Sequence, residues 1–342
     1  MRILHVLNHT YKSNGHVHAA IDLACAQRVS GHEVTIASSG GDFSNILEKN
    51  SVMHIELKLN RHPFSILKAS WKLIKIVKQF DIVHAHMVLS AILSVPACKL
   101  NKTPLITTIH NEFNREAILM GVGKRIIAVS GAVAQSMERR GIPKSRLRTV
   151  LNGTIGTPRC TGPIGASAIK KSPSILFVGG LHPRKGVIDL INAFIILSKY
   201  FTGATLHIVG EGPYKAKYEE LAASSPYSKS IIFHGGKDDT RPWFRDADIF
   251  VLPSLSEPAG LVLSEASEGG CAIIATNVGG IPEMLNNGLA GMLVSPGNPL
   301  ELSNSILLLL NDPARLQTAK LASIANIDRM KVSRVSDETM SI

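Results

Sequence analysis

The sequence contains few aromatic residues and few cysteines. Phe, Trp and Tyr make up 5% of the 342 residues, and none lies in a basic stripe where it could stack on a nucleic-acid base. No zinc-finger or RNP-like pattern is present either, so we expect no nucleic-acid partner. The four cysteines lie far apart and form no C-x-x-C pair, which predicts buried or free thiols in a reducing compartment: Cys25, Cys98, Cys160 and Cys271.

The sequence also has no long hydrophobic run. The longest, at residues 87–98, is interrupted by Ser90, Ser94 and Pro96 and is shorter than the ~18 residues that a membrane span needs. The apolar stretch at the N-terminus is too short for a signal peptide and lacks a small-residue cleavage site. We therefore expect a cytoplasmic protein whose first residues form a buried strand.

Positive charge is concentrated in the first half of the chain. The net charge is +11, and residues 1–150 hold 20 Lys and Arg against 9 Asp and Glu. Residues 151–342 hold 17 of each kind. A nucleic acid could attract such an excess, but the missing aromatic platform argues against it. An anionic membrane surface or an anionic lipid-linked substrate suits the asymmetry better.

Short apolar runs alternate with longer amphipathic ones through the first half. This rhythm predicts a parallel sheet with crossover helices. Strands are expected at residues 2–7, 32–38, 81–87, 104–110 and 125–130, and helices at 19–31, 65–80 and 91–101. The first of these helices should stop at Gly31, which is placed to act as a C′ glycine.

A Gly-, Pro-, Ser- and Thr-rich stretch at residues 151–174 then predicts an interdomain linker. After it the same rhythm restarts, with strands expected at 174–180, 204–210, 229–235, 247–254 and 271–276, and helices at 186–201, near Gly260 and at 299–312. We thus predict an α/β protein with a domain at 1–155, a linker at 156–173 and a second domain at 174–327. Doubly wound sheets bind ligands at the carboxyl ends of their strands, and two facing sheets make a cleft.

Two glutamates, Glu257 and Glu265, flank the start of one predicted helix. The first backbone amides of that helix, near Gly260, Leu261 and Val262, form a ready anion site for a phosphate or pyrophosphate. Glu265 lies about one turn further on, where its carboxylate could accept hydrogen bonds from a ribose diol. Glu257 would then lie on the far side of the pyrophosphate. Taken alone, this spacing favours a solvated helix that carries two chance glutamates.

The stretch EPAGLVLSEA resembles the E-P-x-G-L-x-x-x-E-A signature of the retaining GT-B glycosyltransferases, the glycosyltransferase group 1 or family 4. Further stretches resemble that family's landmarks in its order along nearly the whole chain: residues 81–86, 150–153, 178–187, 209–213, 233–235, 247–254 and 277–285. The resemblance implies two doubly wound Rossmann-like domains that face each other across a cleft. It also implies that a last helix, here within 328–342, packs back on the first domain.

The resemblance implies a role for each residue of the signature. It places Glu265 on the donor ribose, Glu257 beside the transferred sugar and the β-phosphate, and the amides of Gly260, Leu261 and Val262 on the pyrophosphate. No strong protein base is needed if the leaving phosphate takes the acceptor proton in a front-face attack, so Glu257 would orient and stabilise rather than attack.

Two basic residues, Arg184 and Lys185, lie in a second landmark, VGGLHPRKGV. Fixed cations there would stabilise the charge that develops on the leaving nucleoside diphosphate. Lys185 matches the family pattern, but Gly180 stands where the family usually has Arg. We hypothesise that Arg184 supplies part of the missing charge.

In the first domain, Gly15 and His110 match family positions. Gly15 corresponds to one glycine of a pair close to the donor phosphates and the acceptor, while Asn14 replaces the other. His110 ends a predicted strand and matches a histidine that touches the donor sugar. Seven other histidines of this half are interpreted as structural (His16, His18, His84 and His86) or as surface residues (His9, His54 and His62).

Two lookalike motifs are set aside. The D-x-D pattern at Asp246 and Asp248 spans a predicted helix end and strand start, so we read it as structural and predict no metal. The GEG at Gly210–Gly212 lacks the third glycine of a dinucleotide fingerprint, since Lys215 occupies that place, so NAD is not expected. The only small-molecule partner predicted is therefore the nucleotide sugar itself, with no separate cofactor.

The predicted helix at 65–80 is basic and amphipathic. It carries four lysines and one apolar stripe: Lys68, Lys72, Lys75 and Lys78, and Leu67, Trp71, Ile74 and Val77. This pattern is typical of a membrane-surface element. It is also typical of a crossover helix whose apolar stripe packs on the sheet, and the two interpretations are compatible.

Together these features predict a glycosyltransferase that moves a hexose-type sugar from a nucleotide diphosphate sugar to a glycan or lipid-linked acceptor. The resemblance implies retention at the anomeric carbon. Members of this kind often build cell-surface polysaccharide or lipopolysaccharide, and the enzyme would be cytoplasmic or peripheral on the inner face of the membrane. One alternative is a nucleotide-sugar epimerase or hydrolase of the same fold. Another is a non-catalytic sugar-nucleotide-binding subunit, which Asn14 and Gly180 would suit.

Overall fold

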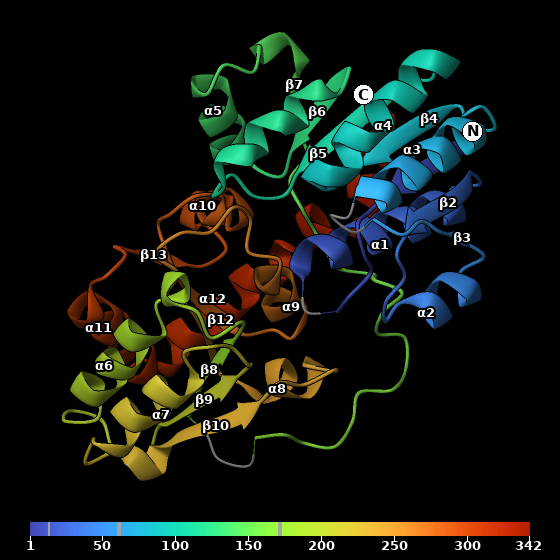
Figure 1. Cartoon of the computed structure of the whole chain (residues 1–342). Coiled ribbons are helices and arrows are strands. Elements are labelled where there is room, and N and C mark those ends of the chain that lie inside the picture. Colours follow the sequence, from blue (N-terminus) through green and yellow to red (C-terminus); the bar gives the residue numbers. More distant parts are fainter. Residues whose placement is uncertain (13, 60–62, 170–172) are drawn as a thin grey trace. The chain divides into compact units, whose positions relative to one another are not determined.

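The chain folds into two compact units in the computed structural model, which describes residues 1–12, 14–59, 63–169 and 173–342 (Figure 1). Unit 1 comprises Met1–Thr161 together with Lys331–Ile342, and unit 2 comprises Gly162–Met330. The chain passes from unit 1 to unit 2 between Thr161 and Gly162, within the predicted linker. His62 lies outside the described residues.

Unit 1 contains a seven-stranded parallel sheet in the order β3-β2-β1-β4-β5-β6-β7. The strands are β1 Arg2–Val6, β2 Glu33–Ser38, β3 Met53–Glu56, β4 Ile82–Ala85, β5 Leu105–Ile109, β6 Arg125–Ala128 and β7 Leu147–Thr149. The five central strands were predicted from their apolar runs. The edge strands β3 and β7 were not, because they are short and largely exposed and so carry no such run.

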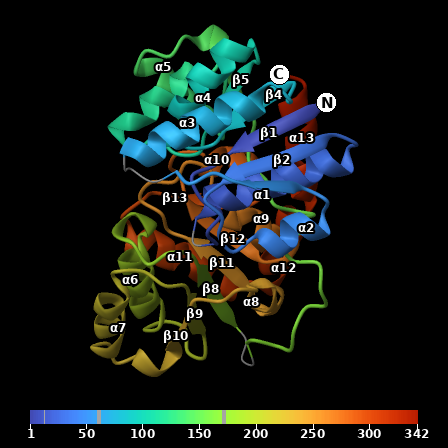
Figure 2. The same cartoon turned by 45° about the vertical axis from the view of Figure 1, so that its right-hand side comes forward.

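The helices of unit 1 cover both faces of this sheet. They are α1 Gly15–Val29, α2 Ser44–Lys49, α3 Pro63–Val77, α4 Val88–Asn101, α5 Gly131–Arg139 and α13 Val332–Met340, with 3-10 turns η1 Arg115–Val122 and η2 Lys144–Arg146. Helices α1 and α13 lie together on one face, and α3 and α4 lie together on the other (Figure 2). Gly31 ends α1 with φ +87°, and His32 N donates to Gln27 O at 3.1 Å, as in a Schellman motif.

The prediction that the apolar residues of α3 form one stripe is wrong in one respect, because some of them are buried and others are exposed. Val77 is fully buried, and the buried face continues through Leu73 and Ala69 at a spacing of four residues. Leu67 and Trp71 instead lie on the exposed face. A crossover helix packs along only one stripe of its surface, and here the small Ala69 allows the close approach that Trp71 could not.

Unit 2 contains a six-stranded parallel sheet in the order β10-β9-β8-β11-β12-β13. The strands are β8 Ser174–Val178, β9 Thr205–Val209, β10 Ile231–Gly235, β11 Ile249–Leu252, β12 Ala272–Thr276 and β13 Met292–Val294. Its helices are α6 Val187–Leu197, α7 Lys215–Ala223, α8 Arg241–Asp246, α9 Val262–Glu268, α10 Ile281–Met284, α11 Pro299–Leu310 and α12 Pro313–Ala325, with 3-10 turns η3 Pro183–Lys185, η4 Ser228–Ser230, η5 Asn286–Gly288 and η6 Ile327–Met330. The fully buried Phe177 and Phe194 anchor its core between sheet and helices.

Each sheet reverses its strand order once, and this feature positions the site. In unit 1 the reversal lies between β1 and β4, and in unit 2 it lies between β8 and β11. In doubly wound sheets the loops that follow two such strands run in opposite directions, and ligands bind between them at the carboxyl ends of the strands.

The two lookalike motifs occupy structural positions. The Asp246 carboxylate accepts a hydrogen bond from Ala168 N at 2.6 Å, and Asp248 pairs with Lys320 Nζ at 2.8 Å. Gly212 packs so tightly on the β8–α6 loop that a Cβ would lie 2.5 Å from Leu181 O. Among the described residues, no helix is long and apolar enough to cross a membrane.

Candidate functional site

In unit 2, the structure brings Lys185 and Glu257 together across the strand reversal. Lys185 comes from the β8–α6 loop and Glu257 from the β11–α9 loop, and Lys185 Nζ forms an ion pair with Glu257 Oε2. The loops themselves touch, because Leu255 N donates to Arg184 O at 2.7 Å. Gly186, at φ +65°, lies so close that a Cβ would be 1.9 Å from Pro253 O. Only glycine allows this approach.

The Glu257 carboxylate is buried, with 7% of the residue exposed. Its Oε2 accepts a hydrogen bond from Ser254 Oγ at 3.3 Å in addition to the ion pair. Its backbone oxygen accepts Gly280 N at 2.9 Å. A buried carboxylate is costly unless it is paired and hydrogen-bonded, so the contacts with Lys185 and Ser254 offset the cost of burying Glu257.

The helix that follows Glu257 begins two residues later than the sequence predicted. Leu261 is the N-cap of α9 and Val262 its first residue, while Gly260 takes φ +70° in the turn before it. The first amides of a helix have no carbonyl of their own helix to bond, so the predicted pyrophosphate amides lie at the start of α9. Leu263 is fully buried and anchors the helix on the sheet.

Glu265 lies in the first turn of α9 and is half-buried. Its Oε2 accepts a hydrogen bond from Thr240 Oγ1 at 3.2 Å. Thr240 immediately precedes α8 and was not predicted as a site residue. It fixes one carboxylate oxygen and so orients the other.

Arg184 occupies a different environment from Lys185. Its side chain is exposed, whereas the Lys185 side chain is 13% exposed. At Gly180, where the resemblance leads one to expect Arg, a Cβ would already lie 3.3 Å from the His182 ring. A larger residue would therefore require His182 to shift.

In unit 1, Gly15 is the first residue of α1, and Asn14 is its N-cap. The next residue, His16, has its ring centroid 5.9 Å from that of His110. His110 directly follows β5, and its Nε2 lies 3.2 Å from His86 Nδ1. The structure thus brings the start of α1 and His110 to the same edge of the sheet.

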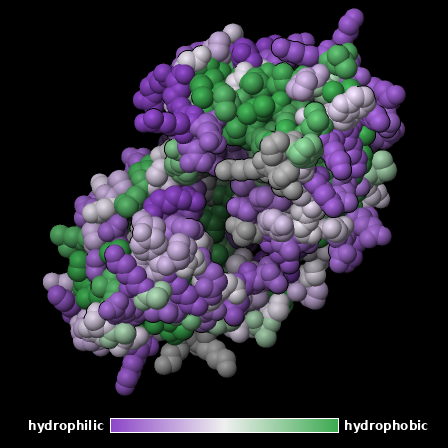
Figure 3. Space-filling view, viewed as in Figure 1, coloured by the Kyte–Doolittle hydropathy of each residue, from purple (hydrophilic) through white to green (hydrophobic). Residues whose placement is uncertain are grey.

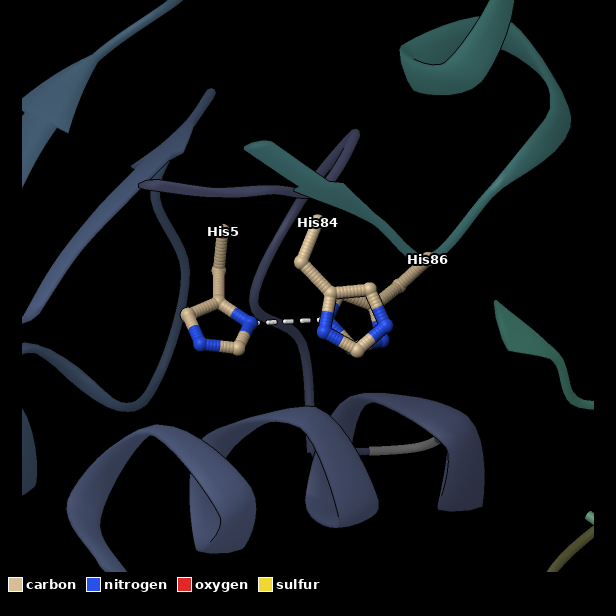
Figure 4. A group of neighbouring side chains, drawn as sticks. All are labelled: His5, His84 and His86. Atoms are coloured by element: carbon tan, nitrogen blue, oxygen red, sulfur yellow. Dashed lines mark hydrogen bonds between the residues drawn. The ribbon is translucent and has the colours of Figure 1, made fainter. Parts of the chain in front are cut away.

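Three further buried histidines, His5, His84 and His86, form a layer between the sheet and α1 (Figure 4). His86 connects this layer to His110. His5 of β1 is paired in register with His84 of β4, and His5 Nδ1 lies 2.9 Å from His86 Nε2. Burial lowers the pKa of His5 to about 4 and that of His110 to about 3, and it lowers the pKa values of His84 and His86 well below 6.5.

The ring nitrogens of His5, His84 and His86 approach within 4.8 Å of one another, so this group could geometrically hold a metal ion. Those nitrogens already have partners in the protein, however. His5 and His86 bond to each other, and His84 Nε2 lies 2.6 Å from Thr108 Oγ1. The donor set thus fits a hydrogen-bonded imidazole layer as it stands.

Comparison with known families assigns the chain. The family model "Glycosyltransferase Family 4" matches residues 13–154, and the model "Glycosyl transferases group 1" matches residues 165–325. The chain belongs to the group 1 glycosyltransferases.

Among curated relatives, the glycogen synthase of Mycobacterium tuberculosis is 30% identical over 257 residues, which are 69% of this chain and 62% of that protein. The chain therefore spans less than two thirds of that relative's length. Among solved structures, the Anabaena protein HepE in complex with UDP has a TM-score of 0.84 at 20% identity, with 100% of this chain and 99% of HepE covered. The lipopolysaccharide outer core galactosyltransferase WaaB has a TM-score of 0.72 at 18% identity, with 100% and 99% covered. These likenesses establish the GT-B fold, which confirms the predicted fold class.

Several residues around the site of this glycosyltransferase were missed or set aside in the sequence. Ser254 ends the landmark at residues 247–254 and Thr240 lies in no landmark, and neither stretch indicates that its hydroxyl binds a glutamate. His84 lies in β4 and His86 directly follows it, two residues further along the extended chain, so both side chains point to the same side of the sheet. That spacing was the signal in the sequence. His5 completes the layer only because β1 pairs with β4.

Proposed function

We propose that this chain transfers a hexose-type sugar from a nucleotide diphosphate sugar to a glycan or lipid-linked acceptor, with retention at the anomeric carbon. The observation that carries the proposal is the Lys185–Glu257 ion pair at the strand reversal of unit 2, beside the start of α9. UDP in the HepE structure and the galactosyl transfer named for WaaB support a nucleotide-hexose donor. The role of WaaB favours cell-surface polysaccharide or lipopolysaccharide assembly.

Lys185 would stabilise the leaving group. As the bond between the anomeric carbon and the β-phosphate oxygen breaks, negative charge grows on the nucleoside diphosphate. A cation already fixed in place by Glu257 needs no reorganisation at that moment and is worth most in the transition state. The α9 amides would hold the pyrophosphate, and Glu265, oriented by Thr240, would hold the ribose. We expect no metal requirement, because Lys185 supplies the charge that a metal would provide.

Glu257 would orient the sugar rather than attack it. Its Oε2 already binds Lys185 and Ser254, which lowers its nucleophilicity. The acceptor hydroxyl would add to the face that the phosphate leaves, and its proton would pass to the departing phosphate oxygen. One carbon–oxygen bond forms as another breaks, so no protein base is consumed.

We also propose that unit 1 binds an anionic membrane surface through α3, on the cytoplasmic side. Its exposed apolar residues are Phe64, Leu67 and Trp71, with exposed fractions of 74%, 60% and 60%. Lys68 and Lys75 are exposed beside them. Figure 3 shows hydrophobic side chains gathered over α3 and α4 of this unit. An apolar stripe flanked by lysines is the pattern of a helix that lies in the lipid interface.

A binding and transfer experiment tests the catalytic proposal. The purified chain is screened by thermal shift against UDP-, GDP- and ADP-sugars, and the stabilising donor is then incubated with membrane extract. We expect stabilisation by one nucleotide class and transfer with an unchanged anomeric configuration, insensitive to EDTA. Epimerisation or hydrolysis without acceptor would instead identify the alternative activities, and donor binding without any transfer would identify a binding subunit.

A further inference from the structure

Four side chains of unit 1 form one continuous row of hydrogen bonds that ends at His110. Gln27 Oε1 of α1 lies 2.7 Å from His5 Nε2, and His5 Nδ1 lies 2.9 Å from His86 Nε2. His86 Nδ1 lies 3.2 Å from His110 Nε2. Gln27, His5 and His86 are all buried, with 1%, 0% and 3% exposed.

The Gln27 amide gives this row a direction. Its Nε2 donates to Met340 Sδ of α13 at 3.4 Å, which turns Oε1 toward His5. A carboxamide oxygen can only accept, so His5 must carry its proton on Nε2. The sulfur of Met340 can accept an N–H but offers nothing to an amide oxygen, which disfavours the flipped amide.

Because a neutral imidazole has one N–H, each bond in the row fixes the next. His5 Nδ1 is a lone pair and accepts from His86 Nε2–H. His86 Nδ1 is then a lone pair and accepts from His110 Nε2–H. The argument requires neutral rings, and burial keeps them so by lowering the pKa values of all three.

The row leaves His110 Nδ1 as an unused acceptor. This atom is buried and has no hydrogen-bond partner among the residues that the structure describes. An unsatisfied buried acceptor is unfavourable, so the position favours a ligand that brings a hydrogen there.

We propose that Gln27, His5 and His86 are positioning residues that hold His110 as the Nε2–H tautomer, so that Nδ1 accepts a hydrogen bond from a hydroxyl of the donor sugar. The inference rests on the proposed function only for the identity of the ligand. It adds a specificity: the group that meets His110 must be a hydrogen donor, and a carboxylate or carbonyl at that place on the sugar would be rejected by the lone pair.

The tautomer is measured directly, without substrate, by long-range 1H–15N correlation spectra of the full chain labelled at histidine. His110 is assigned with His110→Asn. We expect a protonated Nε2 and an unprotonated Nδ1 for His110 at neutral pH. An Nδ1–H tautomer or an imidazolium in the wild-type chain would overturn the proposal. So would a stoichiometric metal retained on His5 and His86, because it would occupy the lone pairs of the row.

Three variants test the cause. Gln27→Met removes the terminal acceptor and Met340→Leu removes the group that orients it, so both should give mixed tautomers at His110. Gln27→Glu keeps an acceptor and should keep the order. Thr108→Val is the matched control, because it breaks the His84 bond in the same buried layer but leaves the row intact. Unchanged spectra in both Gln27→Met and Met340→Leu, or equal mixing in Thr108→Val, would contradict the proposal.

Kinetics give a second readout. We expect Gln27→Met to lower kcat/KM for the donor by roughly ten-fold, the worth of one hydrogen bond, with Gln27→Glu restoring most of it. If no donor supports transfer even in the wild-type chain, the proposed function fails while the spectra still decide the tautomer. If transfer occurs and Gln27→Met mixes the tautomers without any loss of kcat/KM, the role of the row in sugar recognition is wrong.

Discussion

The two units have the same parallel, doubly wound topology, yet they fill the strand reversal with opposite kinds of chemistry. Unit 2 places a cation and a carboxylate there, in contact and nearly buried. Unit 1 places four imidazoles there, which burial holds neutral. An ion pair suits a group that gains charge during a reaction, whereas neutral rings suit the recognition of uncharged hydroxyls. Under the proposed function, the charged site of unit 2 would serve the leaving group and the neutral site of unit 1 would serve the sugar.

We expect the largest effect from removing the cation of the ion pair in unit 2. We expect Lys185→Ala to lower kcat about 10²–10³-fold, as the loss of a transition-state donor does, while donor affinity falls less than about ten-fold. Steady-state kinetics and calorimetric titration of the nucleotide sugar measure the two quantities.

The control for this variant is Lys215→Ala. Lys215 pairs with Glu211 at 2.9 Å in the same unit, but both side chains are more exposed, so its removal should change neither quantity. Equal losses of turnover and donor affinity in Lys185→Ala would refute a transition-state role and leave Lys185 as a simple binding residue.

The neutral imidazole layer should make unit 1 lose stability in acid. The pKa of His5 is lowered to about 4 in the folded chain, against about 6.5 in the unfolded chain. The unfolded state therefore binds more protons below pH 6.5, and stability falls as the pH decreases from about 6.5 to about 4. His5 alone would contribute about 3 kcal/mol across this window.

Hydrogen exchange of the intact chain, read by peptides, measures this loss in each unit. Peptides of β1 and β4 should lose protection before those of β8 and β11, although His207 of unit 2 also has its pKa lowered to about 4 by burial. Simultaneous loss in both units would mean that the imidazole layer does not limit the acid stability of unit 1. The variant His5→Gln should shift the loss to lower pH if it folds.

The candidate site residues that the sequence pointed to are those that lie in contiguous motifs. Glu257, Glu265 and Lys185 each belong to such a stretch, because the turn that presents each one is encoded within a few residues. The central strands were predictable for a similar reason, since burial on both faces leaves continuous apolar runs.

The contacts between motifs could not be predicted. Lys185 and Glu257 are 72 residues apart, and their pairing depends on which strands are neighbours. The row from Gln27 to His110 also ends on Met340, from the last helix of unit 1. For α3, periodicity alone could not tell which of two apolar stripes faces the sheet, so Trp71 was grouped with the buried Val77.

A smaller effect on nucleotide binding is expected from removing Glu265, the proposed ribose ligand. Glu265→Ala should weaken binding of a ribonucleoside diphosphate about ten-fold or more, the worth of hydrogen bonds to a charged group. The wild-type chain should prefer UDP over 2′-deoxy-UDP, and the variant should lose that preference. Calorimetry with both nucleotides checks this, with Glu268→Ala, on the same helix but exposed, as the control. Preserved discrimination in Glu265→Ala would exclude a ribose contact.

The smallest effect concerns the surface of unit 1. Lys68→Gln should weaken binding to vesicles that contain phosphatidylserine about five-fold, since one lysine near an anionic surface contributes about 1 kcal/mol. Trp71→Ser should weaken binding to the same vesicles by removing the apolar area that would be buried in the lipid.

The controls in unit 2 are Lys217→Gln and Tyr200→Ser, both exposed in their unit. Flotation assays with and without the anionic lipid measure the partition. Equal binding to neutral and anionic vesicles would show that electrostatic attraction does not contribute to the binding. Equal losses in the unit 2 variants would show that α3 of unit 1 is not the membrane-binding surface.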